Sequence, residues 1–292
     1  MNKKVIILGC GGMLGYKLFK FLSIQPSINV YGTLRSKNSL RFFNKEEINS
    51  IFTDIDAEEI ESFNGLFKEL NPDFVVNCIG IIKQRNIKDE ILTMIPINSL
   101  FPHKIREICN FYNTKLIQIS TDCVFSGLKG NYKENDLADA NDLYGVSKKL
   151  GELNDTNSLT IRTSIIGEEI QNKKSLLEWF LSQNKTVYGF KKAIFSGLTT
   201  LEFSKIIYHI ILKNPDLNGL FHISSFKIDK YTLLIKIARK YKKNIKILEN
   251  NNYVIDRSLN SSLFQKTVGY IPKDWDKMID EMFKFDLIRS IS

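Results

Sequence analysis

The first 165 residues alternate between short apolar runs and longer amphipathic segments, and this alternation constrains the fold more than any other feature of the sequence. Apolar runs without polar interruption predict strands that are buried on both faces. The predicted strands cover residues 5–8, 29–34, 51–53, 74–77, 115–120 and 159–162, and the predicted helices between them cover 13–22, 58–70, 96–112 and 142–153. We therefore expect an α/β fold with a Rossmann-type, doubly wound parallel sheet.

The alternation becomes less regular beyond Gly167, where the apolar spacing predicts four further helices with short strands between them. These helices cover residues 174–181, 201–212, 230–240 and 275–285. We expect a smaller, mostly helical lobe over the open ends of the strands, where ligands bind in such folds. The predicted division is a Rossmann domain of residues 1–165 and about 200–223, and a substrate-binding lobe of about 166–199 and 224–292.

Composition and residue spacing argue against several other classes of protein. The longest purely apolar runs, 5–8 and 79–82, are far shorter than the roughly 20 residues that span a bilayer, and the chain does not start with a signal-peptide pattern. We therefore expect a cytoplasmic protein without a membrane partner. The four cysteines and three histidines are isolated from one another, so neither a metal site nor a disulfide framework is predicted.

Most of the formal net charge of +9 comes from residues 1–45, which contain eight basic side chains and no Asp or Glu. Aromatic residues do not interleave with these charges in a stacking pattern. A solvated basic face or a phosphate-binding pocket therefore explains the charge better than a nucleic-acid partner, which we do not expect.

A glycine-rich turn follows the first predicted strand and fits the spacing G-x-x-G-x-x-G at Gly9, Gly12 and Gly15. Glycines there allow a tight turn and a close approach to a pyrophosphate, whose charge the free amides at the helix start can receive. The predicted cofactor contacts are thus these three glycines with Met13 and Leu14. The alternative is a tight turn without a ligand.

Arg35 lies 20 residues after Gly15, directly after the second predicted strand, and no carboxylate precedes Glu46. In dinucleotide-binding folds an acidic residue at this distance binds the ribose 2′-hydroxyl, whereas an Arg accommodates a 2′-phosphate. We therefore expect NADP(H) as the preferred cofactor, with NAD(H) as the alternative. The other interpretation is that Arg35 and Lys37 are an exposed basic pair in a loop.

Three residues have the spacing of a proton-transfer site: Thr121 at the end of the fifth predicted strand, and Tyr144 and Lys148 on the following helix. Residues four apart share one helix face, so the ammonium of Lys148 should stabilise the Tyr144 phenolate and lower the phenol's pKa. The phenol could then donate a proton to a substrate oxygen that the Thr121 hydroxyl also contacts.

Four segments, together with the glycine turn, carry a resemblance that covers essentially the whole chain. They are STDCVFSG (120–127), LYGVSKKLGE (143–152), IRTS (161–164) and DRSLNSSL (256–263). The sequence resembles the extended short-chain dehydrogenases/reductases and, more narrowly, the dTDP-4-dehydrorhamnose reductases and related nucleotide-sugar 4-ketoreductases. It departs from them at Ile165, where they usually have Trp, and at 196–199, where they have a Ser-Pro-Thr segment.

The resemblance implies roles for individual residues. Thr121, Tyr144 and Lys148 would be catalytic, and the last two would also contact the cofactor. Asp54 and Ile55 would meet the adenine, Ile79 and Gly80 would line the cofactor, and Asn98 would support Lys148 through water. The substrate would contact Thr121, Asp122, Tyr144 and Arg257. Independently of the resemblance, Lys83 directly after the fourth predicted strand could reach a phosphate or the substrate. The alternative for Lys83 is an exposed loop lysine. The alternative for Arg257 is an ion pair with a carboxylate such as Asp256 or Asp229.

The expected function is therefore NADPH-dependent reduction of the 4-keto group of a nucleotide-activated 6-deoxy-4-hexulose. The substrate would be dTDP-4-dehydrorhamnose or a UDP-linked amino analogue, and the product would serve deoxysugar and surface polysaccharide biosynthesis. Two alternatives remain: an epimerase/reductase of the same fold, and a regulatory subunit resembling the methionine adenosyltransferase beta subunit. A homodimer is also expected as an assembly.

Other reactive or aromatic residues have simpler interpretations. His222 is expected to be a hydrogen-bonded strand residue, and the cysteines are expected to pack without a redox role. Trp179, Phe180 and Trp275 have the helical spacing of core residues rather than of a ligand-stacking surface.

Overall fold

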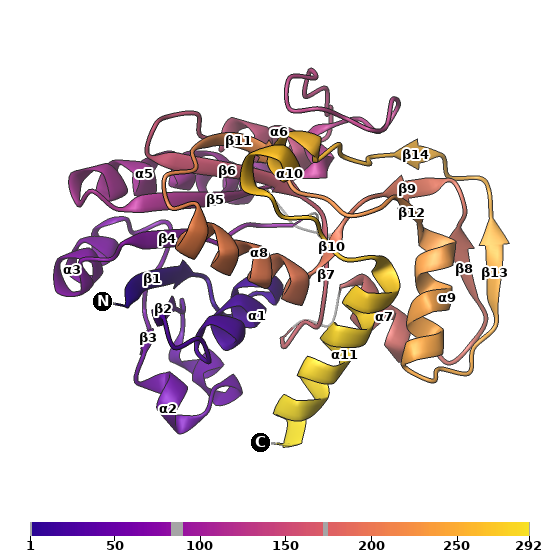
Figure 1. Cartoon of the computed structure of the whole chain (residues 1–292), viewed down its shortest axis with the longest axis horizontal. Helices are drawn as coiled ribbons and strands as arrows, with labels where there is room; N and C mark the ends of the chain where they lie inside the picture. The colour runs from indigo at the N-terminus through magenta and orange to yellow at the C-terminus, as the bar shows by residue number, and fades with distance from the viewer. Residues whose placement is uncertain (1, 83–89, 172–174, 292) are drawn as a thin grey trace.

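The computed structural model describes residues 2–82, 90–171 and 175–291, and its centre is a sheet of seven parallel strands (Figure 1). The strands are β1 (Lys3–Leu8), β2 (Ile28–Thr33), β3 (Ile51–Phe52), β4 (Phe74–Asn77), β5 (Lys115–Thr121), β6 (Ser158–Thr163) and β11 (Gly219–His222). Their spatial order is β11-β6-β5-β4-β1-β2-β3, so the order reverses between β4 and β1. Such a reversal is where ligands bind in doubly wound folds. The predicted Rossmann-type sheet is confirmed.

Helices cover both faces of this sheet. The first face carries α1 (Met13–Leu22) and α8 (Thr200–Lys213), and the second carries α3 (Glu61–Leu70) and α5 (Phe101–Phe111). Val5 and Ile7 pack in the first core cluster, whereas Ile6 and Leu8 pack in the second. Because successive strand residues point to opposite faces, a strand covered on both sides needs a continuous apolar run.

The helix predicted over 96–112 is interrupted in the structure. A short helix, α4 (Glu90–Met94), leads into a π-helical segment, η2 (Ile95–Leu100), and α5 follows. Pro96 and Pro102 lie at the starts of η2 and α5 and have no N–H to donate, which disturbs the regular hydrogen-bond pattern. The π-helical segment contains Asn98, whose contacts are described with the site.

Apart from α8 and β11, the chain after β6 forms a group of elements outside the seven-stranded sheet, called the smaller lobe below. Its helices are α7 (Leu176–Ser182), α9 (Lys230–Lys240), α10 (Ser262–Val268) and α11 (Trp275–Ile291). Three small sheets lie between them: β7 (Ile165–Ile166) with β10 (Leu198–Thr199); β9 (Ala193–Phe195) with β12 (Ile228–Asp229) and β14 (Ile255–Asp256); and β8 (Val187–Phe190) with β13 (Ile247–Asn250). The remaining helical segments are η1 (Lys37–Phe42), α2 (Lys45–Ile48), η3 (Asp122–Val124) and α6 (Leu143–Leu150).

Helix α11 lies between the two parts and contacts α8 of one and α9 of the other (Figure 1). Ion pairs join Lys205 of α8 to Glu281, and Lys236 of α9 to Asp276 at 2.5 Å. A single hydrophobic cluster includes side chains from α1, α8, α9 and α11. None of the helices in the described part of the chain is both long and apolar enough to span a membrane.

Candidate active site

The glycine turn adopts a conformation that requires two of its glycines. Gly9 has a φ of +78°, which residues with a side chain rarely adopt. A Cβ on Gly15 would lie 2.3 Å from the Gly9 carbonyl oxygen, so α1 can start this close to β1 only with glycine there. Gly12 is the N-cap of α1, and its amide donates to the Gly9 carbonyl at 3.1 Å.

The helix that begins at Met13 has features that favour an anion at its N-terminus. No described side chain caps α1, and its first turn, which includes Leu14, contains no acidic residue. The amides and the dipole of the helix therefore present partial positive charge that the protein does not itself neutralise. Met13, Leu14 and Gly15 thus lie where the sequence prediction placed a pyrophosphate.

A groove of about 580 Å³ lies at the carboxyl ends of β1, β2 and β4, at the switch point of the sheet. Six of the predicted cofactor residues line it: Gly9, Gly12, Arg35, Ile55, Ile79 and Gly80. Arg35 is exposed and directly follows Leu34 at the end of β2. The groove therefore brings together the glycine turn and the residue predicted to select the 2′-phosphate.

Asp54 does not line this groove, contrary to the expected adenine contact. It has a φ of 62°, is exposed and forms an ion pair with Lys37 at 3.5 Å. The left-handed turn at this residue puts the following residues against the groove instead, among them Asp56 and Glu58. These two carboxylates were not predicted, because the expected contacts after the third strand were limited to Asp54 and Ile55.

Gly145 allows the catalytic helix to approach the end of β5. Its Cβ would lie 2.3 Å from the Cys123 carbonyl oxygen and 2.5 Å from the Ala140 side chain. Asp142 caps α6 by accepting from the Gly145 amide at 3.1 Å. This close contact brings Tyr144 near Thr121, the last residue of β5.

The predicted coupling between Tyr144 and Lys148 is wrong for the unliganded protein. Burial raises the pKa of the Tyr144 phenol above its ordinary value, and contact with the Thr121 hydroxyl opposes this rise. The Nζ of Lys148 instead donates to the Ile119 carbonyl at 2.7 Å. The phenol consequently keeps its proton at neutral pH, as a proton donor must.

Lys148 lies at the boundary between the active site and the groove. It is 8% exposed, and burial lowers its pKa to about 8, against the opposing charge of Glu152. A Cβ placed on Gly80 would lie 3.7 Å from Nζ, so the ammonium adjoins the groove wall. Asn98 fixes this wall by accepting from the Ile81 amide at 2.9 Å and donating to the Ser147 hydroxyl at 3.0 Å.

A second cavity, of about 380 Å³, begins at Asp122 next to Thr121 and extends into the smaller lobe. Aromatic side chains line it, including Trp179, Tyr188 and Tyr253, which are 39%, 58% and 50% exposed. The expectation that Trp179 packs in the core is therefore wrong, although Phe180 and Trp275 are buried as predicted. Helical spacing identified the inner side of α7 but did not show that a cavity adjoins it.

Arg257 lines this second cavity, and its guanidinium is also bonded to the protein. Nε donates to the Phe125 carbonyl at 2.9 Å, Nη1 donates to the Cys123 thiol at 3.4 Å, and Nη2 lies 3.8 Å from Asp142 Oδ2. The expected alternative partners were Asp256 and Asp229, whereas the structure pairs Arg257 with the cap of α6. Lys83, the other predicted substrate cation, lies outside the described residues.

His222 and the cysteines behave as predicted. His222 is buried, its Nδ1 lies 3.0 Å from the Tyr132 carbonyl oxygen, and burial lowers its pKa to about 4. Burial also raises the pKa of the Cys78 and Cys123 thiols to about 12, so both stay protonated. The described residues contain no cluster of metal-binding side chains.

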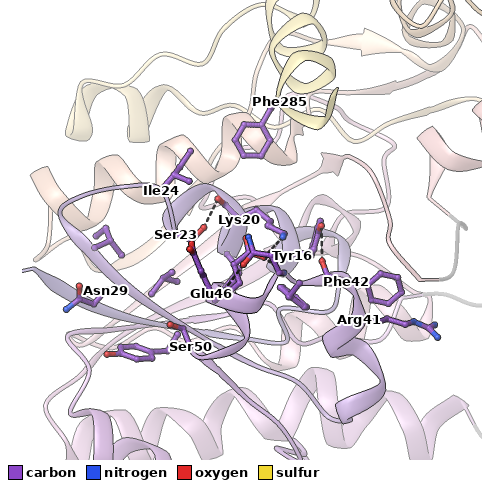
Figure 2. A pocket seen from close by; sticks show the side chains of 17 residues that line it. Tyr16, Lys20, Ser23, Ile24, Asn29, Arg41, Phe42, Glu46, Ser50 and Phe285 are labelled. Atoms are coloured by element: carbon purple, nitrogen blue, oxygen red, sulfur yellow. Dashed lines mark hydrogen bonds and ion pairs between the residues drawn. The ribbon is translucent and has the colours of Figure 1, made fainter. Parts of the chain in front are cut away.

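A cavity of about 920 Å³ lies elsewhere, between α1, β2, η1 and α2, with Phe285 at its edge (Figure 2). Its buried cation, Lys20, forms an ion pair with Glu47 and lies 5.3 Å from the centroid of the Tyr16 ring. Glu47 also accepts from the Asn44 amide at 2.9 Å in the cap of α2. These polar groups bind one another and hold α2 against α1, which is a structural role.

The sheet, the glycine turn and the grouping of Thr121, Tyr144 and Lys148 define an extended short-chain dehydrogenase/reductase. Within that class, the chain belongs to the family described as the RmlD substrate binding domain, which matches residues 3–286.

Known relatives resemble this chain over most of its length. A dTDP-4-dehydrorhamnose reductase of Aggregatibacter actinomycetemcomitans is 25% identical to this chain in an alignment 303 positions long. The alignment covers 94% of this chain and 97% of the relative. The spore coat polysaccharide biosynthesis protein SpsK of Bacillus subtilis is 25% identical over 76% of this chain and 73% of its own length. A crystal structure of dTDP-4-dehydrorhamnose reductase from Bacillus anthracis in complex with NADP has a TM-score of 0.79, with 19% identity and coverage of 97% and 99%.

Proposed function

We propose that this protein is an NADPH-dependent reductase of the 4-keto group of a nucleotide-activated 6-deoxyhexulose, linked to dTDP or UDP. The observation that carries the proposal is the position of the Thr121, Tyr144 and Lys148 group between two hollows. Lys148 adjoins Gly80 in the groove at the switch point, and Thr121 directly precedes Asp122 in the second cavity. A cofactor in the groove and a sugar in the cavity would meet at these side chains.

The residues of the groove fit a dinucleotide. The glycine turn leaves room for a pyrophosphate beside the uncapped start of α1, and Arg35 offers a guanidinium to a 2′-phosphate. Support for NADP(H) over NAD(H) comes from Arg35 and from the relative crystallised with NADP. Other structural neighbours of the same fold were crystallised with NAD, such as WbmG of Bordetella bronchiseptica, so NAD(H) is kept as the alternative.

The side chains of the active site divide the work of ketone reduction. When bound, NADPH supplies the hydride for the carbonyl carbon. Tyr144, protonated at neutral pH, donates its phenolic proton to the carbonyl oxygen as that oxygen gains charge. The Thr121 hydroxyl turns from Asp122, to which it donates at 3.2 Å, and donates to the same oxygen. The Lys148 ammonium, beside the Gly80 wall of the groove, holds the nicotinamide ribose.

The test is to incubate the purified chain with NADPH and a panel of dTDP- and UDP-linked 4-keto-6-deoxy sugars. NADPH oxidation gives the rate, and NMR of the product identifies the reduced carbon and its configuration. We expect oxidation that depends on the sugar nucleotide and is lost in Tyr144→Phe. Oxidation at the same rate in Tyr144→Phe, or none with any sugar in the panel, would contradict the proposal.

The proposal has three further parts. The product supplies a deoxysugar for surface polysaccharide, as the name of SpsK suggests for that relative. The enzyme works in the cytoplasm as a homodimer, which light scattering of the purified chain would test. It has no nucleic-acid partner, and a gel-shift assay with DNA and RNA would test that expectation.

A further inference from the structure

Lys230 is a charged residue of the second cavity that the sequence analysis did not identify. It is the first residue of α9 and lines the cavity together with Asp122 and Arg257. Its Nζ lies 3.8 Å from the centroid of the Phe195 ring. Within the described part of the chain, no hydrogen bond or ion pair engages this ammonium.

This position is unfavourable for a lysine in the unliganded protein. The N-terminus of a helix carries partial positive charge, which repels a cation in the first turn. The carboxylate of Asp229 caps α9 by accepting from the Thr232 amide at 2.8 Å and the Thr232 hydroxyl at 2.7 Å, so it is already engaged. Burial lowers the pKa of Lys230 from its ordinary value, which shows that the site disfavours the charge. The Phe195 ring stabilises the ammonium but offers its N–H groups no oxygen or nitrogen acceptor, so they are available to a ligand.

Asp122 lines the same cavity, and its Oδ2 accepts no hydrogen bond from a described residue. The carboxylate is 5% exposed, and its Oδ1 accepts from the Thr121 hydroxyl at 3.2 Å and the Cys123 thiol at 3.5 Å. Burial raises the pKa of Asp122, and the charges of Lys230 and Arg257 oppose this rise, so the three groups lie within electrostatic range of one another.

The cavity thus offers an ammonium without an acceptor among the described residues and a carboxylate whose Oδ2 has no described donor. A hydroxyl group matches this pair because its oxygen accepts from an ammonium while its hydrogen is donated to a carboxylate. A phosphate would suit Lys230 but would place its charge against Asp122. The reacting carbonyl oxygen lies at Thr121, the neighbour of Asp122 in the chain, so the hydroxyl must lie close to the reduced carbon. In a 4-keto-6-deoxyhexose, only C3 carries a hydroxyl next to that carbon.

We propose that Lys230 and Asp122 together bind the C3 hydroxyl of the sugar, and that Lys230 thereby selects hexoses with a free hydroxyl at this carbon. This inference rests on the proposed function and names the substrate class more closely. Arg257, with Nε, Nη1 and Nη2 all directed at the protein, is less available for this contact.

The test compares the binding of three ligands by calorimetry in the wild type and in Lys230→Met. The ligands are a nucleoside diphosphate, its glucose conjugate and its 3-deoxyglucose conjugate. The nucleoside diphosphate is dTDP or UDP, whichever series the wild type binds more tightly. We expect the wild type to bind the glucose conjugate about 10- to 100-fold more tightly than the 3-deoxy conjugate, the range for hydrogen bonds to charged groups. In Lys230→Met this ratio should fall at least about fivefold, with the affinity for the nucleoside diphosphate unchanged.

Lys191→Met is the matched control. Lys191 also lies over an aromatic ring, 4.9 Å from the centroid of Tyr231, but it does not line the cavity. The control should leave all three affinities unchanged. Lys230→Met should fold, because it removes a cation from a helix N-terminus; Lys230→Gln provides a second variant of similar length.

An unchanged ratio in both Lys230 variants would overturn the inference. Weaker binding of the nucleoside diphosphate itself, by the same factor as its glucose conjugate, would also overturn it and assign Lys230 to the diphosphate. The proposed function has a separate readout, since the wild type would still oxidise NADPH with its keto-sugar substrate in either case. A wild type that binds neither dTDP nor UDP conjugates would contradict both proposals.

Discussion

Replacing Gly145 by alanine tests whether close packing of α6 on the end of β5 creates the active site. The new Cβ would lie 2.3 Å from the backbone oxygen of Cys123, whereas real Cβ contacts essentially never fall below 3.0 Å. The helix must therefore move away by about 0.7 Å or more, because the contacted atom belongs to the backbone and cannot rotate aside. Overpacking of this kind costs about 1–3 kcal/mol of stability. A displacement near 1 Å at a catalytic group can lower the rate about 100-fold.

Gly65→Ala is the matched control for this prediction. Gly65 also lies within a helix, α3, but a Cβ there has no neighbour within 4 Å. Alanine should therefore raise stability by about 0.4–1 kcal/mol through the unfolded chain and leave the rate unchanged. Thermal unfolding and the kcat of NADPH oxidation measure the two effects. A Gly145→Ala enzyme with wild-type kcat and stability would refute the packing argument.

Four other perturbations separate the roles of the charged and phenolic groups. Tyr144→Phe should lower kcat by about 100-fold or more while circular dichroism and NADPH binding stay unchanged, since only a proton donor is removed. Because burial lowers the pKa of Lys148 to about 8, its ammonium loses the proton as pH rises through that value, so a pH profile of kcat should fall above pH 8. Arg35→Ala should weaken the binding of NADPH by about 1.5–3 kcal/mol and the binding of NADH far less. Equal losses of affinity for the two cofactors in fluorescence titrations would show that Arg35 is only a surface residue. Arg257→Ala should raise the KM for the sugar nucleotide. It should also reduce thermal stability by about 1–3 kcal/mol, because the Phe125 carbonyl loses its donor. Unchanged stability would contradict that contact.

The sheet could be predicted because local sequence determines it, and the same holds for the helix that carries Tyr144 and Lys148. A strand buried on both faces is mostly apolar, which is why the cores of β1 and β4 were visible as short apolar runs. The Tyr144–Lys148 spacing and the glycine turn are likewise set by neighbours in the chain. The structure brings these segments together at the switch point that such a sheet always creates.

What the sequence did not reveal depends on partners distant in the chain. Arg257 pairs with Asp142, and no local pattern connects the two. Trp179 has the spacing of a core residue, but the cavity beside it is built by segments far from it in the chain, before it and after it. Lys230 could have been noticed as a cation in the first turn of a helix, where the dipole disfavours it, but Asp122, which lines the same cavity, lies on η3, far away in the chain.

The shared hydrophobic core determines how the protein unfolds on heating or in denaturant. Side chains of α1, α8, α9 and α11 belong to one apolar cluster, so separating the predicted lobe from the Rossmann domain would expose the interior of both. We therefore propose that the two predicted parts fold as one unit. Unfolding should be one cooperative transition, and a substitution in α9 should lower the melting temperature of the central sheet as much as that of the smaller lobe.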